Sequence, residues 1–232
     1  MSNRRLAALL LLTALSDCRE AEQQPSFPKA DRPVAPIVGD SFSTEDVRDR
    51  LGEAEQVIEL AGIRPGMVVA DIGAGEGYYT VRLAPVVGRQ GRVLAEDIVP
   101  EVEERLIQRV HRENLENVAV KLGEPDDPKL PPNSFDRIFL VHVYHEVESP
   151  YAFMWHLRQG LKPDGEVIVV DANRPPKRHG MPPRLLQCEL AAVGLKLVRY
   201  EPITGGEAYF ASFRIAGAPP EPGQIRACKA EA

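Results

Sequence analysis

The chain has 232 residues, which is enough for one sizeable domain but not comfortably for two. Its composition, 44% hydrophobic and 27% charged, is ordinary for a globular protein. The formal net charge of −6 is carried without clustered Lys and Arg, which argues against a nucleic-acid-binding surface but not against a small or cationic ligand.

Residues 1–18 have the features of an export leader. Arg4 and Arg5 precede an apolar run, Leu6 to Leu15, which is too short to span a membrane but typical of a signal peptide. Leu15-Ser-Asp-Cys18 resembles the lipobox of bacterial lipoproteins, except that Asp17 stands where a small residue is usual. We therefore expect a protein that is exported or anchored on the periplasmic side of a bacterial envelope through its N-terminus. It would be cytoplasmic if the leader is not processed, and a plain amphipathic or disordered N-terminus is the alternative.

The domain is expected to begin after a tether. Residues 19–42 are polar and rich in proline, without periodicity, which predicts an extended, disordered segment. Ser43-Thr-Glu-Asp46 is a helix-start signal, and apolar residues then recur at three-to-four spacing up to Ala61. We predict one helix there, and one domain over residues 43–216.

A glycine-rich turn follows the first predicted strand. The apolar run Met67–Ala70 predicts a buried strand closed by Asp71, and Tyr78–Val87 predicts a helix. Gly73, Gly75 and Gly77 lie between them. Strand, glycine turn and helix in this order build the small-molecule sites of α/β folds, because glycine lets the backbone approach a ligand closely.

The spacing of these glycines discriminates between ligands. The dinucleotide fingerprint places a glycine at its sixth position, where Tyr78 stands, and no Lys-Ser/Thr pair is present to form a phosphate-binding P-loop. The pattern Asp71-x-Gly-x-Gly-x-Gly resembles the first motif of class I S-adenosylmethionine-dependent methyltransferases. The resemblance implies that Asp71, Gly73, Gly75 and Gly77 hold the amino-acid end of S-adenosylmethionine.

Acidic residues end the next two predicted strands. Arg92–Ile98 ends in Glu96 and Asp97, and Asp97 lies at the distance from Gly73 at which doubly wound folds place a ribose-binding carboxylate. The pattern leaves open whether Glu96 points to the ligand or away from it. After the strand Val118–Leu122, Glu124 stands where the resemblance implies an acid that reaches the adenine amino group.

The fourth predicted strand, Arg137–Val143, runs into a group of polar residues. His142, Tyr144, His145 and Glu146 lie within five positions. The resemblance implies that they line the methyl group and the acceptor, so we expect the histidines as candidate general bases and Tyr144 as an orienting residue. Two His and a Glu also form a metal-ligand set, but the His-Glu-x-x-His arrangement and any further Cys/His cluster are absent from the sequence, so we predict no metal.

The C-terminal half completes an α/β pattern. Its predicted elements are a helix over Pro150–Leu161, a strand over Glu166–Asp171, a helix over Leu185–Val193, a hairpin of Leu195–Tyr200 with Ala208–Ile215, and an irregular tail, residues 217–232. The loop from Ala172 to Pro183 is basic and either holds an anionic substrate group or is a solvated patch. Cys188 and Cys228 would be free to pair outside the cytoplasm.

Together these patterns predict an α/β fold: a doubly wound, mostly parallel, seven-stranded sheet with a C-terminal antiparallel hairpin and helices on both faces. The function implied is methyl transfer from S-adenosylmethionine to an unidentified, small-molecule nucleophile, with no nucleic-acid partner. A non-catalytic S-adenosylmethionine- or nucleotide-binding protein of the same fold is the first alternative, and an NAD-dependent oxidoreductase the second. The sequence gives no indication of the acceptor or of the oligomeric state.

Overall fold

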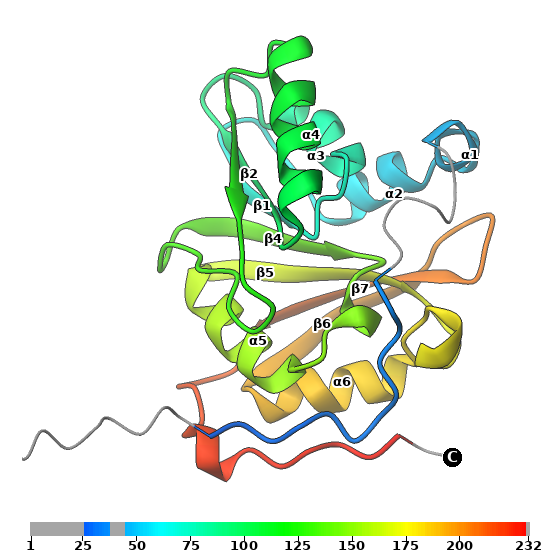
Figure 1. The fold of residues 1–232 in the computed structure, drawn as a ribbon, viewed down its shortest axis with the longest axis vertical. Coiled ribbons are helices and arrows are strands. Elements are labelled where there is room, and N and C mark those ends of the chain that lie inside the picture. The colour runs from blue at the N-terminus through cyan, green and yellow to red at the C-terminus, as the bar shows by residue number, and fades with distance from the viewer. Residues whose placement is uncertain (1–25, 38–44, 231–232) are drawn as a thin grey trace, which may run out of the picture.

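A computed structural model describes residues 26–37 and 45–230. Within them the chain forms a seven-stranded sheet in the order β3-β2-β1-β4-β5-β7-β6 (Figure 1). The strands are β1 (Val68–Ile72), β2 (Arg92–Asp97), β3 (Val118–Leu122), β4 (Phe135–Val141), β5 (Leu161–Ala172), β6 (Leu195–Pro202) and β7 (Ala208–Ile215). Strands β1 to β5 pair in parallel, whereas β7 is antiparallel to both β5 and β6, which confirms the predicted fold.

Helices cover both faces of the sheet. They are α1 (Glu45–Leu51), α2 (Glu53–Leu60), α3 (Tyr78–Val87), α4 (Pro100–Arg112), α5 (Pro150–Leu157) and α6 (Pro183–Ala192), with short 3₁₀ turns at Tyr144–Glu146, Arg158–Gly160, Pro176–Arg178 and Pro222–Gln224. In Figure 1, α2, α3 and α4 lie above the sheet and α5 and α6 lie below it. Parallel strands need such covering because both of their faces are apolar.

The central strands divide their side chains between two hydrophobic clusters. Ile138 and Leu140 of β4 pack with α5 and α6, whereas Phe139 packs with α2 and α3. This alternation follows from the two-residue period of a strand. The carboxyl ends of the parallel strands β1, β2, β4 and β5 lie at the same edge of the sheet. The strand order runs outward in opposite directions from β1 and β4, and ligands of α/β folds bind beside such a switch point.

Several element boundaries differ from the prediction. The single helix expected up to Ala61 is two helices, α1 and α2, separated by Gly52 with φ 64°. A left-handed residue cannot continue a right-handed helix. Similarly, β4 ends at Val141 rather than Val143, because His142 has φ 56°, which is incompatible with a strand.

Residues 26–37, which we call the N-terminal strap, differ from the predicted tether. They contain no helix, but they pack along the domain, and Phe27 contacts Trp155 edge to face with ring centroids 5.7 Å apart. The amide of Ala35 donates a hydrogen bond to the carbonyl of His145 at 3.1 Å, and Arg32 is only 8% exposed. Buried side chains on an otherwise polar segment fix it in place. The leader predicted over residues 1–18 lies outside the described residues.

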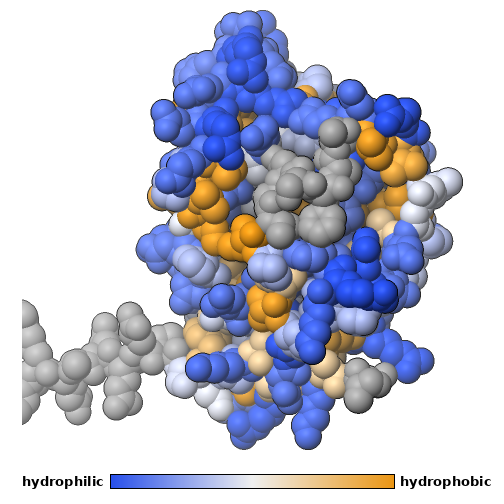
Figure 2. All heavy atoms as spheres, turned by 45° about the vertical axis from the view of Figure 1, so that its right-hand side comes forward, coloured by the Kyte–Doolittle hydropathy of each residue, from blue (hydrophilic) through white to orange (hydrophobic). Residues whose placement is uncertain are grey.

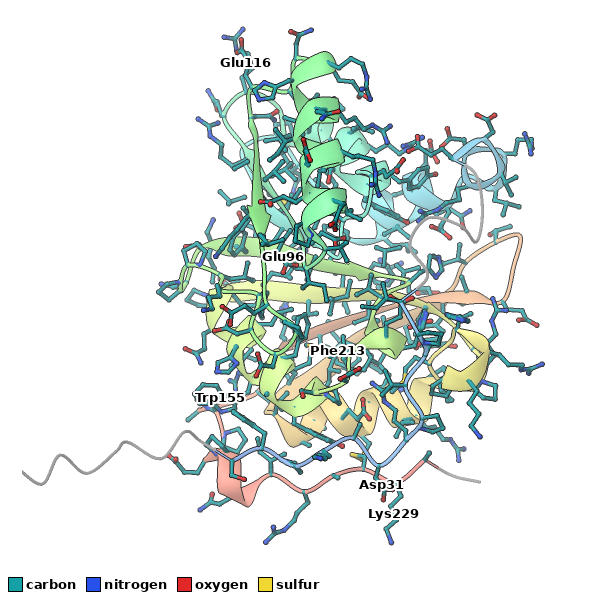
Figure 3. All side chains as sticks on the ribbon, in the orientation of Figure 1. Asp31, Glu96, Glu116, Trp155, Phe213 and Lys229 are labelled. Atoms are coloured by element: carbon teal, nitrogen blue, oxygen red, sulfur yellow. A yellow bond between two sulfur atoms is a disulfide. The ribbon has the colours of Figure 1, made fainter. Side chains whose placement is uncertain are left out.

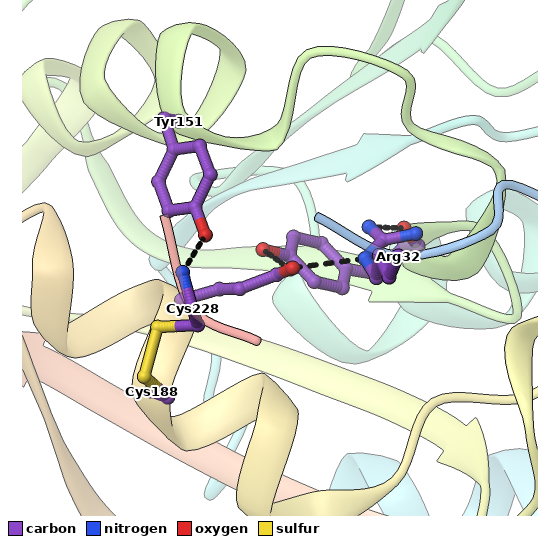
Figure 4. Close-up of a disulfide and its surroundings, with 6 residues drawn as sticks. Arg32, Tyr151, Cys188 and Cys228 are labelled. Carbon is purple, nitrogen blue, oxygen red and sulfur yellow. Dashed lines mark hydrogen bonds and ion pairs between the residues drawn. A yellow bond between two sulfur atoms is a disulfide. The ribbon is translucent and has the colours of Figure 1, made fainter. Parts of the chain in front are cut away.

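The tail after β7 is also part of the fold. Ile225 and Cys228 are buried, and Cys228 forms a disulfide with Cys188 of α6, a pairing that the sequence left open (Figure 4). The amide of Cys228 donates to the hydroxyl oxygen of Tyr151 at 2.6 Å. Beyond it, a parallel bridge joins Asp31 to Lys229, so that the strap and the tail lie side by side at the base of the molecule (Figures 1 and 3).

The surface is mainly hydrophilic. Figure 2 shows charged and polar side chains over most of one face, with smaller apolar areas among them. Ile37, Val47 and Leu51 are among the exposed large apolar side chains. Across residues 26–37 and 45–230, none of the helices has the length and apolarity required to cross a membrane.

Candidate functional site

A cavity of about 700 Å³ opens at the carboxyl ends of β1, β2, β4 and β5. This volume lies within the range of roughly 300–1,000 Å³ that is usual for small-molecule sites. Carboxylates outnumber arginines among the described residues that line it; they are Asp71, Glu76, Glu96, Asp97, Glu146 and Glu148 against Arg48, Arg105 and Arg174. Even without Glu96, whose pKa burial raises to about 8, five carboxyl groups face three arginines, and this excess favours a ligand that carries positive charge.

The three glycines after β1 have two different roles. Gly73 and Gly75 line the cavity with φ of 65° and 57°, and a Cβ on Gly73 would lie 2.6 Å from a methyl group of Val143. Gly77, with φ 91°, is not part of the lining, and a Cβ there would lie 2.6 Å from Leu106 of α4. The first two glycines therefore bring the backbone to the ligand, and Gly77 lets α3 begin against α4.

Asp71 lines the cavity from within β1, because that strand continues to Ile72 instead of ending before Asp71 as predicted. The Thr80 hydroxyl donates a 2.7 Å hydrogen bond to its carboxylate. Burial raises the pKa of Asp71 to about 6, although the hydrogen bond from Thr80 and the charge of Arg48 oppose that rise. Asp71 thus ties β1 to the first turn of α3 beneath the cavity.

Asp97 has the geometry expected of a ribose-binding acid. It lines the cavity at the end of β2, and its two carboxylate oxygens accept the amides of Gly75 and Val99, each at 3.0 Å. Each carboxylate oxygen has a second lone pair, so both remain able to accept a hydroxyl group. The same side chain therefore shapes the glycine turn and offers acceptors to a ligand.

Glu96 also lines the cavity, which answers the question that the sequence left open (Figure 3). The side chain is buried, its Oε1 has no hydrogen-bond partner among the described residues, and burial raises its pKa to about 8. A Cβ at position 123 would collide with this carboxylate, so Gly123 is required beside it.

Glu96→Gln should stabilise the ligand-free protein at alkaline pH. The pKa of Glu96 is about 8 in the folded protein, against the usual value of 4.5 in the unfolded chain. Its contribution to the free energy of unfolding is therefore complete below pH 4.5 and is lost as the pH rises through 8. The pKa difference sets an upper limit near 5 kcal/mol, and we expect on the order of 3 kcal/mol because water entering the cavity relieves part of the penalty. Glutamine stays neutral at every pH.

The measurement is urea unfolding at pH 4 and pH 9, with exposed Glu124→Gln as the matched control. We expect the Glu96→Gln gain only at pH 9 and no change in the control at either pH. Equal stability of Glu96→Gln and wild type at pH 9 would show that Glu96 is not held in its neutral form.

Glu124 is not brought to the cavity. Its side chain is more than half exposed and forms an ion pair with Lys129 at 2.7 Å. The backbone of Glu124 pairs with that of Asp127 in a tight turn after β3, which directs the side chain outward. The predicted adenine contact is therefore not supported, and Pro125 lines the cavity in its place.

The opposite wall of the cavity carries His142 and His145. The Nε2 atom of His142 lies 2.9 Å from a carboxylate oxygen of Glu53 in α2. Burial alone would raise the pKa of Glu53, but the interactions with His142 and Arg48 outweigh it and lower the pKa to about 2. His142 is thus tied to an ionised carboxylate, which leaves His145, although more deeply buried, as the histidine of the pair whose Nε2 is not engaged by Glu53.

His145 forms a dyad with Asp171. Its Nδ1 lies 3.0 Å from both carboxylate oxygens of Asp171, which is fully buried at the end of β5. The amide of Ala172 also donates to Asp171 at 2.7 Å. The carboxylate of Asp171 accepts from Nδ1–H, so that in the neutral ring the lone pair is on Nε2. Nε2 lies 4.0 Å from Oε1 of Glu146.

Tyr144 is not in the cavity, contrary to the prediction of an orienting role. It is fully buried in the cluster with α5 and α6, and its hydroxyl donates to Glu189 at 2.8 Å. Glu189 in turn forms a buried ion pair with Arg32 of the strap at 2.9 Å (Figure 4). The 3₁₀ turn after β4 directs Tyr144 into this cluster and His145 to the cavity.

Two residues of the cavity wall were not singled out from the sequence. Arg174 and His179 come from the basic loop after β5, and the His145 and His179 rings meet edge to face at 5.5 Å. The Nδ1 atom of His179 lies 4.0 Å from Oε1 of Glu146. The one feature of the sequence that could have indicated these two residues is the position of their loop at the carboxyl end of a strand, because such loops often carry functional residues.

Comparisons with known proteins agree with this geometry. The family model described as a methyltransferase domain matches residues 63–193. A ubiquinone/menaquinone biosynthesis C-methyltransferase from Hydrogenovibrio crunogenus is 32% identical over 124 residues, which cover 50% of this chain and 46% of that protein. A protein-L-isoaspartate O-methyltransferase from Pyrococcus horikoshii is 29% identical over 113 residues, 49% of this chain and 48% of that protein. The chain spans about half the length of the curated relatives it matches.

Among solved structures, a S-adenosylmethionine-dependent methyltransferase from Aquifex aeolicus aligns with a TM-score of 0.65 and 25% identity over 75% of this chain and all of that one. The fold and the site thus define the class I S-adenosylmethionine-dependent methyltransferases. The chain belongs to the methyltransferase domain family. This membership implies S-adenosylmethionine as the cofactor, and the residues present fit it: a turn that admits only glycine at Gly73, and the acceptor oxygens of Asp97.

Proposed function

We propose that the protein transfers a methyl group from S-adenosylmethionine to a small-molecule nucleophile that must lose a proton. The observation that carries this proposal is the His145–Asp171 dyad, in which Asp171 engages Nδ1 and Nε2 is the remaining ring nitrogen at the wall of the cavity. The relatives named as C- and O-methyltransferases act on different atoms, so they do not fix the acceptor atom of this chain.

Each wall of the cavity has a distinct part in this reaction. The glycine turn and Asp97 would hold the cofactor, which supplies a reactive methyl group on a positively charged sulfur. The surrounding carboxylates favour that positive charge. His145 would take the proton of the acceptor at Nε2, and Asp171 would hold the imidazole in the required tautomer and stabilise its charged form. Proximity, alignment and exclusion of water supply the rest of the rate enhancement.

Asp97→Ala should weaken the binding of S-adenosylmethionine about 10- to 100-fold. Hydrogen bonds to a charged acceptor contribute about 1.5–3 kcal/mol, and 1.4 kcal/mol corresponds to a factor of ten. The measurement is calorimetric titration of the full chain with S-adenosylmethionine and S-adenosylhomocysteine. Glu124→Ala is the control and should bind like wild type, because its side chain is outside the cavity.

Thermal unfolding must accompany this titration, because Asp97 also holds the amides of Gly75 and Val99. Asp97→Asn, which keeps the size and one acceptor oxygen, should bind with intermediate affinity. Absence of binding by folded wild-type protein would contradict the proposed function and favour a non-catalytic protein of the same fold.

We also propose that the protein is exported, and that it can be attached to a membrane through its N-terminal region. The leader pattern of residues 1–18 supports this, as does the Cys188–Cys228 disulfide, because disulfides persist mainly in oxidising compartments. Fractionation of cells that express the full chain, with thiol titration of each fraction, tests the proposal. Recovery only in the cytoplasm with both cysteines reduced would contradict it.

A further inference from the structure

We propose that His145, Glu146 and His179 bind a divalent transition-metal ion such as Zn²⁺ at the acceptor end of the cavity. Each of the three side chains offers one ligand atom, and these atoms all lie within 4.8 Å of one another. All three residues line the same cavity. The binding site stands on this geometry alone, whereas the role of the ion described below rests on the proposed function.

The distances are close to those of a formed site. Glu146 Oε1 lies 4.0 Å from His145 Nε2 and 4.0 Å from His179 Nδ1. Ligand atoms around a tetrahedral zinc ion lie about 3.3 Å apart, so side-chain rotations that move each atom by less than about 1 Å complete the set. Two imidazoles and one carboxylate are a ligand set that suits zinc and its neighbours in the first transition row.

The surroundings of His145 resemble those of a metal ligand. Its Nδ1 is bound to the fully buried carboxylate of Asp171, so that Nε2, 4.0 Å from Glu146 Oε1, is the nitrogen on the side of the cluster. Histidines that bind metals usually donate their other ring N–H to a carboxylate in this way, which fixes the ring orientation and makes the ligand more basic.

The site differs from the ligand set that the sequence suggested and that we set aside. That set contained His142, which the structure instead pairs with Glu53 at 2.9 Å. His179 takes its place from the loop after β5, 34 residues beyond His145, so that no local motif reveals the set.

Three protein ligands leave one coordination position open, which is the pattern of catalytic rather than structural zinc sites. That position faces the cavity, where an oxygen, nitrogen or sulfur atom of the acceptor would bind. A bound ion lowers the pKa of such a group, and in the metal-bound protein this effect would replace proton removal by His145.

The test is titration of chelator-treated full chain with Co²⁺, followed by absorbance, and with Zn²⁺, followed by calorimetry, both without S-adenosylmethionine. We expect one ion per chain. Glu146→Gln and His179→Ala should each weaken binding by about 100-fold, and Asp171→Asn, which acts through His145, by about 10- to 100-fold. His111→Ala, on the exposed side of α4, is the control and should not change the affinity.

Unfolding curves establish that each variant is folded, and the two ligand variants serve as independent tests if one of them is not. Absence of saturable one-to-one binding, or binding that neither Glu146→Gln nor His179→Ala weakens, would overturn the proposal. S-adenosylmethionine affinity measured on the same samples separates the two proposals: cofactor binding without metal binding overturns only the metal site, and the reverse overturns only the methyltransferase function.

Discussion

Replacing His145 by alanine should lower kcat about 10³-fold and leave the affinity for S-adenosylmethionine within about twofold of wild type. A positioned general base contributes typically about 10²–10⁴-fold, whereas the expected cofactor contacts come from Asp97 and the glycine turn on the other wall. The measurement is the release of S-adenosylhomocysteine with an acceptor found by screening, in parallel with calorimetric titration of the cofactor.

Asp171→Asn separates a catalytic role of His145 from a structural one. Asparagine keeps the shape but removes the ionised acceptor that holds the proton on Nδ1, so kcat should fall and its pH profile should change. His111→Ala is the matched control and should keep wild-type kcat. Unchanged turnover of His145→Ala across the pH range would remove His145 from the mechanism.

Replacing Arg32 by alanine should destabilise the fold by about 4 kcal/mol. The side chains of Arg32 and Glu189 are both fully buried, and loss of one member of a buried ion pair typically costs about 3–5 kcal/mol because it leaves an uncompensated charge. Arg32 also donates to the carbonyl groups of Tyr144 and Val147, which flank His145 and Glu146. Urea unfolding of the full chain at neutral pH measures the loss.

Two further variants test the cause of this effect. The double variant Arg32→Met with Glu189→Met should recover most of the lost stability, because two apolar side chains leave no buried charge. Lys129→Ala, which breaks an exposed ion pair with Glu124, should cost less than about 1 kcal/mol. A loss below 1 kcal/mol for Arg32→Ala would show that the strap is not anchored through this residue.

The predicted site residues that the structure brings to the cavity are those encoded locally. The strand, the glycine turn and Asp97 are consecutive or separated by one helix, so spacing alone places them at one edge of the sheet. The prediction for Tyr144 failed because it grouped four neighbouring polar residues, whereas the positive φ of His142 ends β4 and the 3₁₀ turn that follows separates Tyr144 from the others. His179 lies in an irregular loop after β5, and the hydrophobic periodicity of the sequence does not predict the path of such a loop.

The strap was predicted as a tether for a related physical reason. Composition and periodicity describe averages over many residues, and the segment is polar and rich in proline on average. Its attachment depends on a few individual side chains, Arg32 and Ala35 in particular, whose partners lie far away in the sequence. Only the three-dimensional structure brings those partners together.

The anchoring of the strap also affects the order in which the protein folds during synthesis. Arg32 leaves the ribosome early, but Tyr144 follows 112 residues later and Glu189 157 residues later. Contacts between residues so distant in sequence form late, because a long loop of chain must close before the contact can stabilise the fold. The elements that build the cofactor side, β1 and β2, are complete much sooner. Because Ala35 and Ile37 line the cavity and Arg32 pairs with Glu189, this part of the cavity wall is fixed only when α6 is in place. The wall that Ala35 and Ile37 add to the cavity would therefore be among the last parts of it to form.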